Sequence, residues 1–226
     1  MQKLKQKHKS ILVVGMGRFG RHLALNMQEM GHSVMVADNN PNMESDLSNL
    51  FENYVIGDCT NEHVLHALGV PEFDVCFVTI GKHFESSIII TSRLKTLGAQ
   101  RIVTKAGRAI QTEVLKKIGA DEIVYPEKEM AEKLAVRYSA SNILDYIELS
   151  GDYSVFEITV PEEWIGKTIG ALDVRRKYNV NILALKHDTE IRAMPSADCM
   201  LCAEDIVVLM GKDDDVFRLT AKASRS

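Results

Sequence analysis

The chain has 226 residues, 46% hydrophobic and 26% charged, the balance of a soluble globular protein with one large or two small domains. The formal net charge of −4 provides no global basic field for nucleic acid, so no nucleic-acid partner is expected. Apolar runs are too short for a membrane helix, and the glycines of residues 15–20 interrupt any signal-peptide core, so we expect a cytoplasmic protein.

The first predicted element is an apolar, β-branched strand at residues 11–14. The pattern G-x-G-x-x-G follows at residues 15–20, and a helical stretch at 21–30 comes next. Strand, tight turn and helix in this order are typical of a dinucleotide-binding fold. The free N–H groups and the positive dipole end of the helix would then face phosphates.

Each glycine of the motif has its own expected role. Gly15 permits the turn, Gly17 lets a phosphate approach the backbone, and Gly20 lets the helix pack on the strand. A second predicted strand at 33–37 ends in Asp38, whose carboxylate would accept hydrogen bonds from ribose hydroxyls and repel a 2′-phosphate. The pattern therefore predicts a nucleotide site that disfavours NADP. The alternative is a Rossmann-like domain that has lost its ligand.

The first two-thirds of the chain alternates helix and strand. We expect helices at 41–51, 62–68, 84–97 and 109–118, and strands at 54–56, 73–79, 101–104 and 122–125. This order predicts an α/β domain, residues 1–126, with a Rossmann-like doubly wound parallel sheet. Ligands of such sheets lie at the carboxyl ends of the strands. The residues gathered there are Gly15 to Gly20, Asp38, Asp58, Thr79, Lys105 and Glu127.

A long helical stretch, Glu127 to Glu148, follows the last predicted strand and is not needed to close the sheet. We interpret residues 127–150 as a crossover helix that acts as a dimer arm. The alternative is an ordinary covering helix.

The pattern changes near Gly151. Alternating strands and short helices then predict a small α+β domain over residues 151–226. Its expected strands are 154–160, 181–186, 190–193 and 206–210, and its expected helices are 172–178 and 214–221. Cys199 and Cys202 form a C-x-x-C without the second pair or histidine that a zinc site needs, so we expect reduced thiols.

Several segments together resemble the RCK (regulator of K⁺ conductance) family, namely residues 15–20, 57–60, 116–121, 125–131, 164–175 and 181–185. The resemblance covers nearly the whole chain. Among RCK proteins, the chain is most similar to the cytosolic gating subunits of Ktr-type potassium transporters, which have a TrkA-N and a TrkA-C domain. The resemblance implies a protein that is not an enzyme. It also implies a homodimer that assembles into an octameric ring beneath a membrane K⁺ channel subunit. ATP would favour the active ring and ADP would compete with it.

The resemblance implies a nucleotide site made of Gly15, Met16, Gly17, Arg18, Phe19, Gly20, Asp38, Asn39, Asp58, Cys59, Thr60, Thr79, Ile80, Gly81, Lys105 and Glu127. Arg18 would reach the terminal phosphate, which a guanidinium can pair bidentately, and Lys105 would contact the phosphate side. Asp38 would hold the ribose, and Asp58 with Cys59 would lie at the adenine end.

Glu127 is the implied metal ligand. Its carboxylate would help to hold Mg²⁺, Ca²⁺ or Na⁺ between phosphates across the dimer, because these cations prefer oxygen ligands. One departure from the family pattern is Arg21-His22, where small residues are more usual. It leaves the preference among nucleotides open.

Related proteins of Gram-positive bacteria bind cyclic di-AMP at the dimer interface of their C-terminal domains. The resemblance implies a pocket of Ile169, Asp173, Val174, Arg175, Asn181, Ile182 and Pro195. Arg175 suits a phosphate and Asn181 a polar contact. The alternative is that Ile169, Val174 and Ile182 are core residues.

Two other functions fit the glycine motif and Asp38: an NAD(H)-binding sensor and an NAD-dependent oxidoreductase. An oxidoreductase needs an acid or base above the nicotinamide. His63, His66 and His83 lie on predicted helices or their approaches, where a solvated role is expected. The predicted second domain contains no evident acid–base pair.

Overall fold

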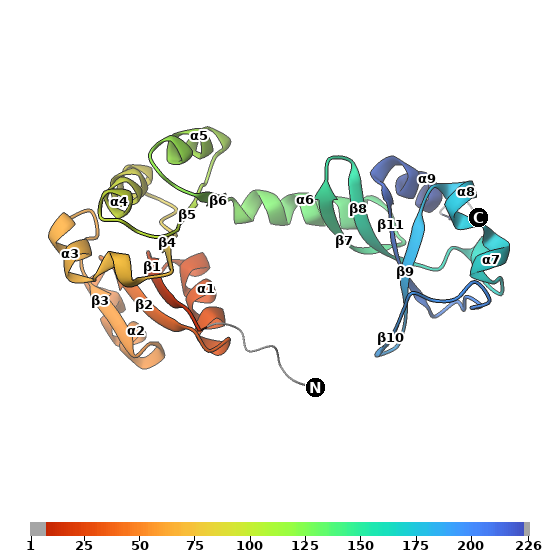
Figure 1. Ribbon diagram of the computed structural model, residues 1–226, viewed down its shortest axis with the longest axis horizontal. Helices are drawn as coiled ribbons and strands as arrows, with labels where there is room; N and C mark the ends of the chain where they lie inside the picture. The colour runs from red at the N-terminus through yellow and green to blue at the C-terminus, as the bar shows by residue number, and fades with distance from the viewer. Residues whose placement is uncertain (1–7, 224–226) are drawn as a thin grey trace. The chain divides into compact units, whose positions relative to one another are not determined.

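The computed structural model describes residues 8–223 and divides into two compact units, one ending at Glu127 and the other beginning at Lys128 (Figure 1). Within residues 8–223, no helix combines the length and the apolar character that crossing a membrane requires. The sequence also predicts a short solvated basic arm of Lys3, Lys5, Lys7, His8 and Lys9, and its three residues Lys3, Lys5 and Lys7 lie outside the described residues.

The first unit is built on a parallel sheet with the strand order β3-β2-β1-β4-β5-β6. Its strands are β1 (Ser10–Val14), β2 (Ser33–Asp38), β3 (Asn53–Ile56), β4 (Val75–Val78), β5 (Ile102–Lys105) and β6 (Glu122–Val124). Its helices are α1 (Arg18–Glu29), α2 (Glu44–Leu50), α3 (Glu62–Ala67), α4 (Phe84–Thr96) and α5 (Ala109–Lys117), with short 3₁₀ turns at Pro41–Met43 and Val70–Glu72. The predicted doubly wound parallel sheet is confirmed.

Both faces of this sheet are covered, because successive side chains of β1 point to opposite sides. Ile11 and Val13 pack with α1 and α2 on one face, whereas Leu12 and Val14 pack with α3 and α4 on the other. None of the four is more than 2% exposed, and each contributes roughly 1.5–3 kcal/mol of hydrophobic stabilisation. Both faces of β1 are therefore closed, and ligands of such sheets bind where the strands end.

The second unit begins in helix α6 (Pro126–Ser139) and contains an antiparallel sheet with the order β10-β9-β11-β8-β7. Its strands are β7 (Ile143–Ser150), β8 (Tyr153–Thr159), β9 (Asn181–His187), β10 (Glu190–Ala193) and β11 (Ile206–Lys212). Its other helices are the 3₁₀ turn Glu162–Trp164, α7 (Ile169–Leu172), α8 (Val174–Tyr178) and α9 (Asp213–Ala223). Trp164 and Phe156, both fully buried, belong to its core. The predicted small α+β fold is confirmed, but its sheet begins with β7, before the expected domain start at residue 151.

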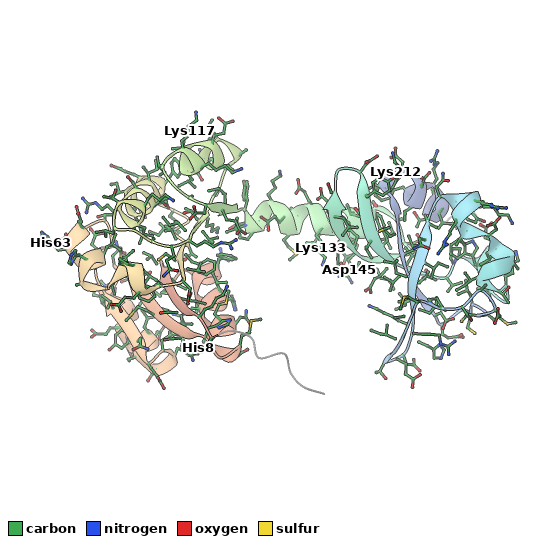
Figure 2. All side chains as sticks on the ribbon, viewed as in Figure 1. His8, His63, Lys117, Lys133, Asp145 and Lys212 are labelled. Carbon is green, nitrogen blue, oxygen red and sulfur yellow. The ribbon has the colours of Figure 1, made fainter. Side chains whose placement is uncertain are left out.

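The helix expected over 127–148 is wrong in its second half. Helix α6 ends at Ser139, and residues 143–150 form β7, which pairs antiparallel with β8. Lys133 of α6 lies beside Asp145 of β7, with 3.0 Å between Nζ and Oδ1, so the chain reverses direction after α6 (Figure 2). The cause is a tertiary pairing: Gly151, at φ +62°, permits the hairpin turn, and β8 gains a partner for its backbone.

The single helix expected at 172–178 is also divided. Asp173 adopts a left-handed conformation at φ +46° and separates α7 from α8. A left-handed residue cannot continue an α-helix, and aspartate tolerates that conformation better than most side chains.

Candidate functional site

The turn between β1 and α1 requires glycine at two of its positions. Gly15 has φ +95°, and a Cβ there would lie 2.9 Å from Ile80 Cγ1. At Gly20 a Cβ would lie 2.1 Å from the Gly15 carbonyl oxygen and 2.4 Å from Thr79 Oγ1. A Cβ at Gly17 would meet no atom within 4 Å, so the space above this residue is open. The geometry matches the roles expected for Gly15 and Gly20.

Thr79, which follows β4, stabilises this turn through its side-chain hydroxyl. Its side chain is buried, and its hydroxyl lies 2.5 Å from the Gly15 carbonyl oxygen and 3.0 Å from the Val14 carbonyl oxygen. Both acceptors are backbone groups at the end of β1. Thr79 thus holds the turn through its buried hydroxyl.

Asp38, at the end of β2, contacts the same turn. Its Oδ2 accepts a hydrogen bond from the Met16 N–H at 2.6 Å, and its Oδ1 accepts one from the Asn40 N–H at 2.9 Å. Each carboxylate oxygen has two acceptor sites, so both can still accept from ribose hydroxyls. Asn39, the next residue, is exposed, whereas the Met16 side chain is buried.

A charged pair lies on the other side of the glycine turn. Lys105, at the end of β5, places its Nζ 2.5 Å from Oε1 of Glu127 and 5.7 Å from the centre of the Phe19 ring. The Lys105 side chain is only 10% exposed, whereas Glu127 is 63% exposed. A Cβ at Gly81 would lie 3.7 Å from the lysine Nζ, which is ordinary van der Waals contact, so Gly81 lies next to the ammonium group.

Electrostatics connect this pair to the turn. The hydrogen bond from Lys105 lowers the pKa of Glu127 below its ordinary value, and the charge of Arg18 shifts it in the same direction. Glu127 is therefore an ionised carboxylate at neutral pH. Four predicted site residues, Phe19, Gly81, Lys105 and Glu127, thus lie together, with the Arg18 charge near enough to act on Glu127.

A third group follows β3. Asp58 Oδ1 accepts hydrogen bonds from the Thr60 backbone N–H at 2.9 Å and from its hydroxyl at 2.7 Å. These bonds lower the pKa of Asp58. Cys59 is a core residue, and burial raises the pKa of its thiol to about 12. The side chain of Cys59 therefore packs in the core.

Sequence reasoning missed one residue of this group. Arg93, on α4, donates a hydrogen bond from Nη1 to the Thr60 carbonyl oxygen. The two residues are 33 positions apart, and no local pattern distinguishes Arg93 from other basic residues on a helix.

In the second unit, some of the residues predicted to bind cyclic di-AMP contact one another. Arg175 donates from Nε to Oδ1 of Asn181 at 2.9 Å. Val174 is buried in the core, and Ile169 and Ile182 pack against that core. The Ile169 N–H donates to the Cys199 carbonyl at 3.0 Å, which holds the loop that follows Pro195 beside α7. All four cysteines are free.

Comparison with known proteins gives the family of this chain. The TrkA-N domain model matches residues 11–126, and the TrkA-C domain model matches residues 155–223. Ktr system potassium uptake protein C of Bacillus subtilis (strain 168) is 39% identical over 210 residues, which cover 93% of this chain and 95% of that protein. Ktr system potassium uptake protein A of the same strain is 36% identical over 212 residues, 94% of this chain and 96% of that protein.

The fold also matches solved structures. The GsuK channel bound to NAD has a TM-score of 0.67 and 20% identity. The match covers 93% of this chain and 38% of that chain. The expected resemblance to RCK proteins is confirmed. This chain belongs to the family of Ktr-system potassium uptake proteins, in which a TrkA-N domain is followed by a TrkA-C domain.

Proposed function

We propose that this chain is the nucleotide-regulated gating subunit of a Ktr-type potassium transporter, activated by ATP relative to ADP. It acts in the cytoplasm, peripheral to the inner face of the membrane, through a membrane K⁺ channel subunit. The main supporting observation is the site at the carboxyl ends of the parallel strands, where the glycine turn, Asp38 and the Lys105–Glu127 pair lie next to one another. Its relatives over more than nine-tenths of the chain are potassium uptake proteins, which favours gating over oxidoreductase chemistry.

The site suits the polyphosphate of an adenine nucleotide. The first turn of α1 contains no acidic residue, so its backbone N–H groups and dipole attract phosphates unopposed. Open space at Gly17 permits close approach. Asp38 then takes the ribose, and Lys105 and Arg18 take the phosphates.

Glu127 alone cannot bind a hard cation, so a cation at this position needs further ligands. Within the described residues, no group of three or more histidine, cysteine, aspartate or glutamate side chains is arranged to hold a metal ion. Phosphate oxygens and the partner subunit's Glu127 would complete the ligands of Mg²⁺, Ca²⁺ or Na⁺. The cation would neutralise the phosphates that face each other in the dimer.

Assembly into a homodimer, and then an octameric ring, is supported by an apolar stripe on α6. Met130, Leu134 and Tyr138 recur every four residues and are 55%, 43% and 77% exposed. Helix α6 has no buried residue. A helix that leaves such a face uncovered within its own unit is suited to pack against a second copy.

Cyclic di-AMP is the proposed inhibitory ligand of the second unit. The Arg175–Asn181 hydrogen bond gives a guanidinium a fixed direction, which suits phosphate binding. Ile169 and Ile182, which are half-buried, could line a base, whereas Val174 serves the core.

Adenine nucleotides are expected to raise the melting temperature of the full chain, with micromolar affinities that correspond to about −8 kcal/mol. Titration with ATP, ADP, NAD⁺, NADH and cyclic di-AMP, followed by calorimetry, checks this. Tight NADH binding without ATP binding would instead identify an NAD(H) sensor, a function that Asp38 also permits.

Arg18→Ala is expected to weaken ATP binding by more than ADP binding. The loss of one charge-assisted pair at the last phosphate should cost about 1.5–3 kcal/mol. Arg21→Ala is the matched control on the same helix, because Arg21 is paired with Asp46 at 3.2 Å. Equal weakening of ATP and ADP by Arg18→Ala, measured by calorimetry, would refute the role of Arg18.

A further inference from the structure

In the short turn after β3, hydrogen bonds hold both the N–H and the carbonyl group of Thr60. Its N–H and hydroxyl donate to Oδ1 of Asp58, at 2.9 Å and 2.7 Å. Its carbonyl oxygen accepts a hydrogen bond from Nη1 of Arg93, a half-buried side chain on α4. Arg93 thus reaches from the helix to the backbone that orients Asp58.

This arrangement sets both the direction and the charge of the Asp58 carboxylate. The bonds from Thr60 occupy Oδ1, and in the described part of the chain Oδ2 has no hydrogen bond. The pKa of Asp58 is lowered, first by Thr60 and also by the positive charge of Arg93. Asp58 is therefore an ionised acceptor with one oxygen available at an exposed position.

The location of this acceptor decides what it can recognise. Asp58 follows the edge strand β3, next to β2, which carries Asp38 at its end. If Asp38 holds the ribose, the base lies toward β3. An ionised carboxylate there accepts a hydrogen bond from the 6-amino group of adenine and discriminates against a purine that lacks this donor.

We propose that Arg93 is a positioning residue for base selectivity: by holding the Thr60 carbonyl, it fixes Asp58 in the orientation that recognises the 6-amino group of adenine. The inference rests on the proposed nucleotide site and adds a residue on α4 to it. Arg93 acts through Thr60 and need not touch the ligand.

The test compares ADP with purine riboside 5′-diphosphate, which has the same ribose and phosphates but no 6-amino group. The full-length wild-type chain is expected to bind ADP about tenfold more tightly, the effect of one hydrogen bond to a charged group. Arg93→Met keeps the length of the unbranched aliphatic stem of arginine but removes the guanidinium donor. It is expected to reduce the ratio to about twofold or less by weakening ADP alone, and Arg93→Lys should restore part of it.

Lys95→Met is the matched control, because Lys95 is on the same helix and pairs with Asp121 at 3.4 Å, away from Thr60. In an Asp58→Asn background, Arg93→Met should change the ratio no further. If Arg93→Met fails to fold, as judged by thermal unfolding, Arg93→Gln is measured instead.

Two results would overturn the proposal: an affinity ratio that is unchanged in a folded Arg93 variant, with or without equal weakening of both nucleotides, or a wild-type chain that does not discriminate between them. Equal weakening would indicate a purely structural role for Arg93. If the wild-type chain binds both nucleotides equally well, the proposed nucleotide site stands and only the recognition of the 6-amino group is refuted. A wild-type chain that binds neither refutes the proposed nucleotide site itself.

Discussion

Gly20→Ala is expected to destabilise the first unit strongly and to abolish nucleotide binding. The new Cβ would lie 2.1 Å from the Gly15 carbonyl oxygen and 2.4 Å from Thr79 Oγ1, well inside van der Waals contact. A backbone atom on one side and a buried side chain on the other leave no easy relaxation. Overpacking of this kind costs roughly 3 kcal/mol or more, which lowers the melting temperature of a unit of this size by about 10 °C.

Gly17→Ala is the matched control. Its Cβ would meet nothing within 4 Å, and its φ of −65° suits alanine. Loss of the glycine N-cap should cost at most about 1 kcal/mol of folding stability, while the methyl group obstructs the phosphate. We therefore expect Gly17→Ala to fold nearly as well as the wild type but to bind ATP at least about tenfold more weakly, a loss of roughly 1.4 kcal/mol.

Calorimetric unfolding separates the two variants. Trp164, the single tryptophan, lies in the second unit, so its fluorescence follows that unit independently. Gly20→Ala should lower the unfolding transition of the first unit without changing the fluorescence transition. A Gly20→Ala chain that melts like the wild type would show that the turn relaxes and that the close packing of helix on strand is not required.

Glu127→Gln is expected to abolish the stabilisation of the ATP-bound assembly by divalent cations. Two ATP molecules that face each other across a dimer bring negative charges together, and unit charges about 4 Å apart repel by roughly 4 kcal/mol at an effective dielectric of 20. A cation held by Glu127 removes this repulsion. ATP affinity without added cation should be retained, because Lys105 loses a competing partner 2.5 Å away and becomes available to phosphate.

The measurement is the melting temperature with ATP, with and without Mg²⁺ or Ca²⁺. Glu132→Gln is the matched control, because Glu132 lies on the same helix and forms an exposed pair with Lys128 at 3.5 Å. If Glu127→Gln keeps the full cation-dependent rise, Glu127 is not a ligand. Its negative charge would then serve the N-terminus of α6 and the ion pair with Lys105.

The first unit could be predicted from the sequence in outline because its signals are local. A β-branched strand, a glycine turn and a helix are contiguous at residues 10–29, and the φ of Gly15 and the tight packing at Gly20 match the roles that the motif implies. Asp38 was found for the same reason, since it ends the next strand. In a parallel sheet, strand ends meet at one edge, so sequence order alone places these residues near each other.

The second half of the predicted crossover helix was wrong because its signal was local and the deciding interaction was not. Residues 143–150 contain apolar residues compatible with a helix, but pairing with β8 and the stacking of Tyr146 on Phe156, 5.8 Å between ring centres, favour a strand. Tertiary pairing overrides intrinsic propensity when a neighbouring strand would otherwise lose its backbone partner.

The sequence by itself determined the fold class, the glycine turn and the acidic residue at the end of β2. Only the tertiary structure decided that Lys105 pairs with Glu127, that Thr79 supports the turn and that Arg93 holds Thr60. These contacts join residues 22 to 64 positions apart. Their hydrogen bonds depend on distances of a few ångströms between separate elements, which the packing of the sheet sets and which no residue pattern along the chain encodes.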